Sequence, residues 1–324
     1  MGIMCKVMRG NFIESMHVAY VVVLDGAGQI VKNWGDPYYL TCVRSALKPF
    51  QASAAVATGA TSAAGFTSAE LALMCASHNG EDIHVQTAQE MLEKLGYDMS
   101  YYECGSHIPY DRKSKVDLVK NSQEPTPLQN NCSGKHAGML CLAKYLKADP
   151  AGYTNVEHPV QQVIMKQVKK YSELEDFPLA VDGCSAPVPF MSLYNIALMY
   201  QKLASVDYED LSTLYEAMVS NPMLVAGTDR FDTNFIEVLK GRAVTKIGGE
   251  GVIGIGFRND DGSVLGIAIK ILDGNQRCVP PVALAVLENL KLLTSAELEK
   301  LKKYSNITLK NHRLLEVGSI VIEI

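Results

Sequence analysis

The sequence predicts an α+β fold, in which one antiparallel sheet is built from both ends of the chain around a helical region. Segments rich in β-branched and aromatic residues lie near the N-terminus and again around residue 260, and each pair of segments flanks a turn-forming stretch. Between these ends, alanine and leucine recur at helical spacing. Strands at both ends of a helical middle are typical of the α+β class.

Each end of the chain contains a predicted β-hairpin. The first joins residues 17–24 and 29–34 through the sequence DGAG, and the second joins residues 251–258 and 264–272 through NDDG. Short polar linkers that contain glycine favour tight hairpin turns. We therefore expect the two hairpins to contribute strands to the same sheet.

The middle of the chain contains five segments with the periodicity of helices that bury one face. They are residues 45–59, 68–76, 84–95, 135–147 and 159–171. Two loops, at 124–134 and 182–189, are dense in Pro, Asn, Ser and Gly. No repeat or linker divides the chain, so residues 1–324 are expected to form a single catalytic domain or two packed lobes, with the helical part at about 45–220.

Composition narrows the function classes. The 324 residues are 48% hydrophobic and 20% charged, as in ordinary globular proteins. A net charge of -5 with scattered lysines and arginines argues against a nucleic-acid partner. No apolar stretch approaches the roughly 20 residues of a membrane span, and no signal-peptide core is apparent, so we expect a cytoplasmic protein without a membrane partner. The eight cysteines lack CxxC spacing and are expected to be reduced.

The first chemical signal is an S-x-x-K motif formed by Ser45 and Lys48. A spacing of three residues at a helix start places both side chains on one face. A serine hydroxyl is a poor nucleophile until a base takes its proton, and a lysine can be that base when burial or a second cation lowers its pKa. The motif also occurs in exposed helix starts, so further elements are needed to support a catalytic interpretation.

Two further elements follow in order: Ser77-His78-Asn79, and Lys270 on the last predicted strand. The order S-x-x-K, S-x-N and strand lysine is that of serine β-lactamases and penicillin-binding proteins. It predicts Ser77 as a proton relay to the leaving amine and Lys270 as a cation that anchors a carboxylate or perturbs the base. The alternatives are a helix-terminating cap for Ser77 and an exposed strand lysine for Lys270. Lys270 precedes Ile-Leu-Asp-Gly instead of Thr-Gly, which departs from a true β-lactamase.

Longer blocks make the resemblance specific. The segments RGNFIESMH, RSALKPFQ, CASHNGE, NNCSGKHAGML and DGCSAPVP resemble the hallmark blocks of the bacterial-type L-asparaginase II family, and NPMLVAGTDRFDT and KIGGEGVIGIG continue the likeness. The resemblance implies a serine β-lactamase/glutaminase-like fold and a homodimer. It also implies hydrolysis of L-asparagine to L-aspartate and ammonia through a Ser-Lys acyl-enzyme.

The resemblance places four residues in the catalytic set, namely Ser45 as nucleophile, Lys48 as base, Ser77 and Lys270. The substrate-binding set expected around them is Arg44, His78, Asn79, Asp182 and Glu250. Weaker candidates are Glu81, Arg230 and Asp232, because charged loop residues are more often solvated or structural.

A separate group of residues, Cys132, Lys135 and Cys184, lies in two turn-rich loops. Two thiolates and a neighbouring nitrogen can bind zinc, and the resemblance implies one zinc ion between these three residues, with Asp182 close by. No organic cofactor is expected. The alternatives are that both cysteines are small buried residues, or that Cys132 and His136 form a thiol nucleophile and its base.

Two other functions remain open at this point. The first alternative to an asparaginase is a related serine amidase that acts on glutamine or another amide. The second is a catalytically silent metal- or ligand-binding protein with the same fold. Turnover of the competing amides distinguishes the first, and metal content without ammonia release distinguishes the second. The intact pair Ser45 and Lys48 favours an enzyme.

Overall fold

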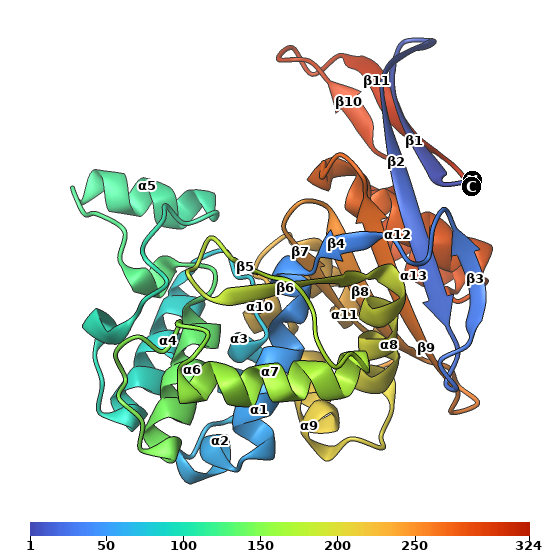
Figure 1. Ribbon diagram of the computed structural model, residues 1–324. Helices are drawn as coiled ribbons and strands as arrows, with labels where there is room; N and C mark the ends of the chain where they lie inside the picture. Colours follow the sequence, from blue (N-terminus) through green and yellow to red (C-terminus); the bar gives the residue numbers. More distant parts are fainter.

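The computed structural model describes residues 1–324 and contains one large antiparallel sheet with helices on both faces (Figure 1). The sheet has eight strands in the order β10-β11-β1-β2-β9-β8-β7, and β3 pairs with β2. Its strands are β1 (Ile3–Arg9), β2 (Phe12–Leu24), β3 (Ile30–Trp34), β7 (Ala243–Gly248), β8 (Val252–Arg258), β9 (Val264–Ile271), β10 (Thr308–Lys310) and β11 (Glu316–Glu323). The predicted α+β class is confirmed.

Both ends of the chain complete this sheet, as expected. β1 lies between β2 and β11, and the second half of β2 pairs with β9 from Ala19 to Leu24. In Figure 1 the ends of the chain, β1 and β11, run side by side in an arm that projects from the body. The two predicted hairpins correspond to β2–β3 and β8–β9. Strand β11 was not predicted from the sequence, because Ile320 is its only buried residue and the strand shows little apolar alternation.

The helical region lies between β4 (Leu40–Cys42) and β7 and also holds a small sheet of β4, β5 (Leu179–Val181) and β6 (Pro187–Ser192). Its first helices are η1 (Arg44–Leu47), α1 (Lys48–Ala57), α2 (Ala60–Ala63), α3 (Ser68–Met74), α4 (Asp82–Leu95), η2 (Met99–Tyr101), α5 (Arg112–Lys120), η3 (Pro127–Gln129), α6 (Ser133–Leu146) and α7 (Pro159–Ser172). All five predicted helices are present, and the first opens with the 3-10 turn η1.

The remaining helices are α8 (Leu193–Ala204), α9 (Glu209–Ser220), α10 (Pro222–Val225), α11 (Phe231–Leu239), η4 (Gln276–Cys278), α12 (Val279–Asn289) and α13 (Ser295–Ser305). Helix α8 covers one face of the sheet, and α12 and α13 cover the other (Figure 1). No helix of the chain has the length and apolar character that a membrane crossing requires.

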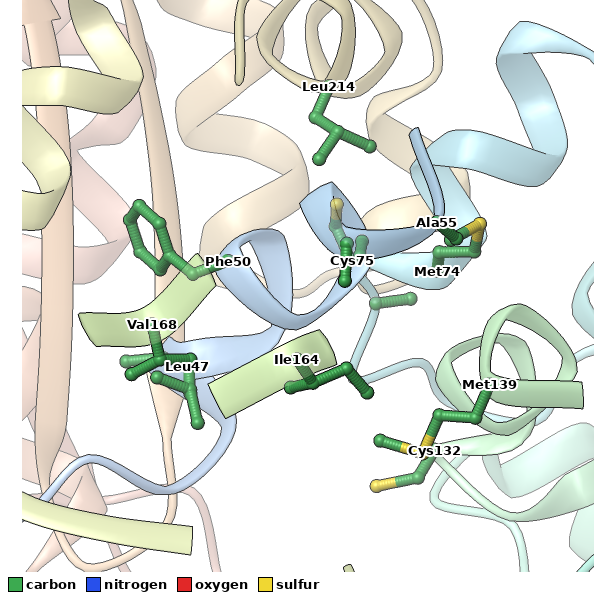
Figure 2. Close-up of a cluster of buried hydrophobic side chains, with 14 of the residues drawn as sticks. Leu47, Phe50, Ala55, Met74, Cys75, Cys132, Met139, Ile164, Val168 and Leu214 are labelled. Carbon is green, nitrogen blue, oxygen red and sulfur yellow. The ribbon is translucent and has the colours of Figure 1, made fainter. Parts of the chain in front are cut away.

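The sheet separates two hydrophobic cores. Val22 and Ala268 face the larger core beneath the helical region, while their neighbours Val21 and Ile269 face the smaller core beneath α11 to α13. This alternation follows from the two-residue period of strands. Figure 2 shows part of the larger core, where Phe50 of α1 and the side chains of α7 are buried. The division of residues 1–324 into one domain or two packed lobes stays a prediction.

Three glycines allow α8 to lie directly on the sheet. A Cβ at Gly254 would come within 1.9 Å of the Tyr200 ring, and one at Gly266 would come within 2.0 Å of the Ala197 carbonyl oxygen. A Cβ at Gly256 would lie 2.8 Å from the Tyr200 carbonyl oxygen. This contact brings Tyr200 to the start of α1, where its hydroxyl donates a hydrogen bond to the Ala46 carbonyl at 2.7 Å.

We expect the substitution Gly266→Ala to lower the free energy of unfolding by about 3 kcal/mol, because its methyl group overlaps the backbone of α8. Urea unfolding with linear extrapolation measures this loss. Gly26→Ala is the matched control, since its Cβ would meet only Val264 at 3.5 Å. Equal stability of the two variants would contradict the direct packing of α8 on β9.

Candidate active site

Ser45, Ser77 and Asn79 line one cleft of about 770 Å³. This volume is in the range of small-molecule sites. The guanidinium-bearing residues Arg112 and Arg230 and the carboxylate-bearing residues Asp111 and Asp229 also line it. The cleft therefore offers groups of both charge signs beside two serine hydroxyls, as a small zwitterionic ligand requires.

Ser45 lies in the turn η1, at the point where β4 leads into α1. Arg44, the residue before it, has a left-handed backbone with φ 51°. Gly248 at the end of β7 packs against this turn, since a Cβ there would lie 3.2 Å from the Ser45 backbone nitrogen and 2.9 Å from the Val43 oxygen. The Arg44 side chain donates from Nε to Asp182 Oδ1 at 2.8 Å. The turn is thus held from the sheet on one side and from the 182–189 loop on the other.

Lys48 is 1% exposed, and its amine joins three segments of the chain. Nζ donates to the Ala76 carbonyl, to Ser77 Oγ at 2.9 Å and to the Asn131 carbonyl at 3.0 Å. The Ser45 hydroxyl is not among these partners. A neutral amine would retain two carbonyl contacts and leave its lone pair for a hydroxyl proton.

A second buried lysine, Lys246 on β7, was missed by the sequence analysis. It is 0% exposed, and its Nζ lies 3.4 Å from Asp232 Oδ2 and 2.6 Å from the Ile247 carbonyl. Burial lowers the pKa of Lys246 to about 8; the charge of Lys48 acts in the same direction, and Asp232 opposes it. The signal was present in the sequence, because Lys246-Ile247-Gly248 carries glycine two positions after lysine, as K-[ST]-G does.

Lys270, the lysine singled out from the sequence, lies on β9 and does not line the cleft. Its Nζ donates to the carbonyls of Glu250, at 2.6 Å, and Ile271. The Glu250 side chain is 73% exposed and lies 3.9 Å from Arg44. Lys270 and Glu250 therefore contact each other, and Asp182 and Arg44 contact each other, outside the lining of the cleft.

The predicted residues His78 and Asn79 point to different sides. His78 is fully buried behind the cleft, where Nδ1 accepts from the Gly80 N–H and Nε2 donates to Ser133 Oγ at 2.9 Å. Burial, together with nearby cations, holds the pKa of His78 well below its usual range, so the ring is neutral. Asn79 lines the cleft, and its Oδ1 accepts from Arg230 at 2.8 Å. Asn79 thus positions a cation in the cleft.

The predicted zinc ligands Cys132, Lys135 and Cys184 lie together and are buried. Lys135 Nζ donates to Cys184 Sγ at 2.8 Å. The pKa of the Cys184 thiol is lowered, first by its contact with Cys132 and then by the charge of Lys135. The pKa of Lys135 is raised, because the two sulfurs outweigh the effect of its burial. Both shifts favour the charged forms, a thiolate at Cys184 beside an ammonium at Lys135.

The chemistry of this group suits a soft divalent cation. His136 follows Lys135, and its Nε2 is buried without a hydrogen-bond partner, while Nδ1 contacts the Tyr153 hydroxyl at 2.6 Å. No group of three or more His, Cys, Asp or Glu side chains in the structure is arranged to hold a metal. The fit therefore depends on the amine of Lys135 as a ligand beside the two sulfurs, with His136 as the nearest additional nitrogen.

Comparison with known families places this site in context. The L-asparaginase II family model matches residues 5–322. The chain belongs to this family. Its membership, predicted from the sequence blocks, is thereby confirmed, and it supports an amidohydrolase of the asparaginase type.

The other comparisons add little. No curated protein sequence matches this family member. Among solved structures, it is similar to the crystal structure of a β-lactamase from Francisella tularensis, with 14% sequence identity and a TM-score of 0.42. The similarity covers 85% of this chain and 93% of that one.

The depressed pKa of Lys246 leads to a prediction about stability. Below about pH 8 the lysine is charged in the folded and the unfolded chain, so the full cost of burying the charge is present. Between about pH 8 and its ordinary value the folded chain releases the proton first, and stability rises by roughly 3 kcal/mol relative to the variant Lys246→Met.

Urea unfolding at about pH 7 and about pH 10 measures this difference. The control is Lys310→Met, which replaces an exposed strand lysine and should show no pH-dependent difference from the wild type in this window. If the difference in free energy of unfolding between the wild type and Lys246→Met does not change with pH, the Lys246 amine stays charged.

Proposed function

We propose that this chain hydrolyses the side-chain amide of L-asparagine to L-aspartate and ammonia, with Ser45 as the nucleophile. The observation that carries the proposal is the geometry of one cleft, in which Ser45 and Ser77 are exposed to a ligand and the buried amine of Lys48 contacts Ser77. Membership of the L-asparaginase II family supports the same reaction type.

The acylation step requires a neutral amine near the serines. Lys48, Lys246 and Asp232 share one buried region, so the single carboxylate balances only one ammonium charge. Burial and the nearby charge of Lys48 lower the pKa of Lys246 to about 8. In the proposed mechanism Lys48 is the neutral amine, and it takes the proton of Ser45 while the hydroxyl oxygen bonds to the amide carbon.

Different groups act on the oxyanion and on the leaving group in this proposal. The backbone N–H of Ser45 is proposed as one donor to the oxyanion, a contribution on the order of 3 kcal/mol in other hydrolases. Ser77, hydrogen-bonded to Lys48, passes the proton to the departing ammonia. Water then attacks the acyl-enzyme, using the same base, and releases aspartate and Ser45.

The remaining predicted residues have supporting roles in this proposal. The charged ends of a free amino acid match the arginines and aspartates that line the cleft, namely Arg112, Arg230, Asp111 and Asp229. Arg44 and Asp182 brace the nucleophile turn. Lys270 is assigned a positioning role through the Glu250 carbonyl, because it does not line the cleft.

We also propose that Cys132, Lys135 and Cys184 hold one zinc ion, which supplies a Lewis-acid centre beside the cleft when bound. Asn131 supports this placement, since it lines the cleft and its Oδ1 accepts a hydrogen bond from the Cys132 thiol at 3.1 Å. Lys135 must lose its proton to become a ligand, so binding weakens as pH falls.

The homodimer stays a prediction. The arm at the chain ends exposes several large apolar side chains, namely Phe12, Ile13, Met16, Leu314, Leu315 and Val321. Apolar surface of this kind is commonly covered by subunit contacts. A cytoplasmic location likewise stays a prediction from the sequence.

Ammonia release from L-asparagine tests the proposed reaction. We expect Ser45→Ala to reduce kcat by about 10⁴-fold or more, because the nucleophile is lost. Ser53→Ala, which removes a buried serine hydroxyl from the next helix, α1, should remain within about threefold of the wild type. L-Glutamine serves as the comparison substrate. Full activity of Ser45→Ala would show that another residue is the nucleophile, and Cys132 would be the next candidate. Inactivity of the wild type on both amides would refute the proposed reaction.

Elemental analysis of the purified protein tests the metal proposal. The wild type should contain close to one zinc ion per chain, and Cys184→Ser should lose it, because a thiolate ligand is replaced by a hydroxyl. Cys141→Ser, at an isolated buried cysteine on α6, should retain the metal. Equal zinc content in the two variants, or none in the wild type, would refute the site independently of any activity.

A further inference from the structure

Two free cysteines from opposite ends of the chain meet in the smaller core. Cys5 lies on β1, and Cys278 ends the turn η4, 273 positions later. Their sulfur atoms are 2.6 Å apart, and both side chains are fully buried. The sulfurs need to approach by only about 0.6 Å to reach the length of a disulfide bond.

A polar network lies beside this pair. His17 is the cross-strand partner of Cys5, and its Nδ1 contacts Asp273 Oδ2 at 2.6 Å. Arg277 donates to His17 Nε2 at 2.8 Å and to Ser15 Oγ at 2.8 Å. Because a guanidinium can only donate, His17 Nε2 accepts this hydrogen bond, and Nδ1 faces the Asp273 carboxylate. Arg277 and Asp273 are the charged groups beside the two thiols, and they shift the pKa of Cys278 in opposite directions.

The two thiols differ in acidity as a result. The pKa of Cys278 is lowered, first by the hydrogen bond from Cys5 and then, against the effect of burial, by Arg277. By contrast, burial raises the pKa of Cys75 and Cys141 to about 12. A thiolate next to a second thiol is the arrangement that oxidants convert into a disulfide.

We propose that Cys5 and Cys278 are a redox modification site, at which a small hydroperoxide forms a reversible disulfide that staples the N-terminal strand to η4. This role is separate from amide hydrolysis. It depends on the contact of the two sulfurs and on the position of η4, not on the chemistry of the cleft.

The reaction balances in two steps. The Cys278 thiolate attacks one hydroperoxide oxygen, so that an S–O bond forms, the O–O bond breaks, and the released alkoxide or hydroxide takes up a proton. The Cys5 sulfur then attacks the sulfenic sulfur, so that the S–S bond forms and the S–O bond breaks, and water leaves with the Cys5 proton. Two thiols are oxidised and one hydroperoxide is reduced. A dithiol reductant reverses the bond by exchange.

The disulfide between Cys5 and Cys278 affects the wall of the cleft. Gln276, in the same turn as Cys278, lines the cleft, and its Nε2 donates to the Gly248 carbonyl at 2.9 Å. Gly248 in turn packs on the Ser45 backbone. A bond at Cys278 therefore fixes the turn that supports the end of β7. It also cross-links residues that enclose most of the chain, which stabilises the folded state against unfolding.

The test begins with the wild-type protein and hydrogen peroxide at a low molar excess, followed by thiol alkylation and peptide mapping by mass spectrometry. We expect one cross-linked peptide pair, containing Cys5 and Cys278, that dithiothreitol abolishes. We also expect the midpoint of thermal unfolding to rise by about 5 °C and to return after reduction.

Variants assign the effect. Cys5→Ala and Cys278→Ala should each lack the cross-link and the rise in midpoint, whereas Cys141→Ala should behave as the wild type. A map in which peroxide links only Cys132 to Cys184, or oxidises Cys278 without a cross-link, overturns the proposal. The wild-type map decides the question even if one variant does not fold.

Discussion

The buried amine of Lys48 is the contact on which the geometry of the cleft depends. It connects three parts of the chain, namely the start of α1, the segment after α3 and the loop before α6. Carbonyl groups left without a donor in such an enclosed place cost free energy, so the three segments are held where the amine can reach them. The positions of Ser77 and Asn131 in the cleft follow from this arrangement.

A second set of constraints fixes the turn that carries Ser45. The glycines of β8 and β9 let α8 approach the sheet, and Tyr200 then reaches the carbonyl of Ala46. Gly248 lies against the other side of the turn, and Arg44 adopts a left-handed backbone that this packing maintains. Unfavourable backbone conformations of this kind persist where the surrounding structure determines them, and they are concentrated at functional sites. The nucleophile is thus supported by the sheet as well as by its own helix.

Local patterns made part of this structure predictable. The two hairpins and the five helices show strong periodicity. Ser45, Lys48 and Ser77 lie in short motifs that occur in a recognisable order along the chain. The choice between Lys246 and Lys270 was different in kind. Each lysine lies on a strand of the second half of the chain. The glycine two positions after Lys246 was a local signal, but the packing of the end of β7 on the nucleophile turn is seen only in the folded structure. The inward direction of His78 likewise depends on packing that no local pattern encodes.

The pairing of both chain ends in one sheet also has a consequence for synthesis on the ribosome. Among the strands of the sheet, β1 is synthesised first and its neighbour β11 last. The strand β2 can pair with β9 only after about 240 further residues have been synthesised. At typical elongation rates that interval is on the order of 10 to 50 seconds. During it the helical region can begin to collapse, while the nascent N-terminal strands present unpaired edges that are prone to aggregation. The sheet can therefore be completed only after β11 has left the exit tunnel, and chaperone protection of residues 1–24 would be most valuable until then.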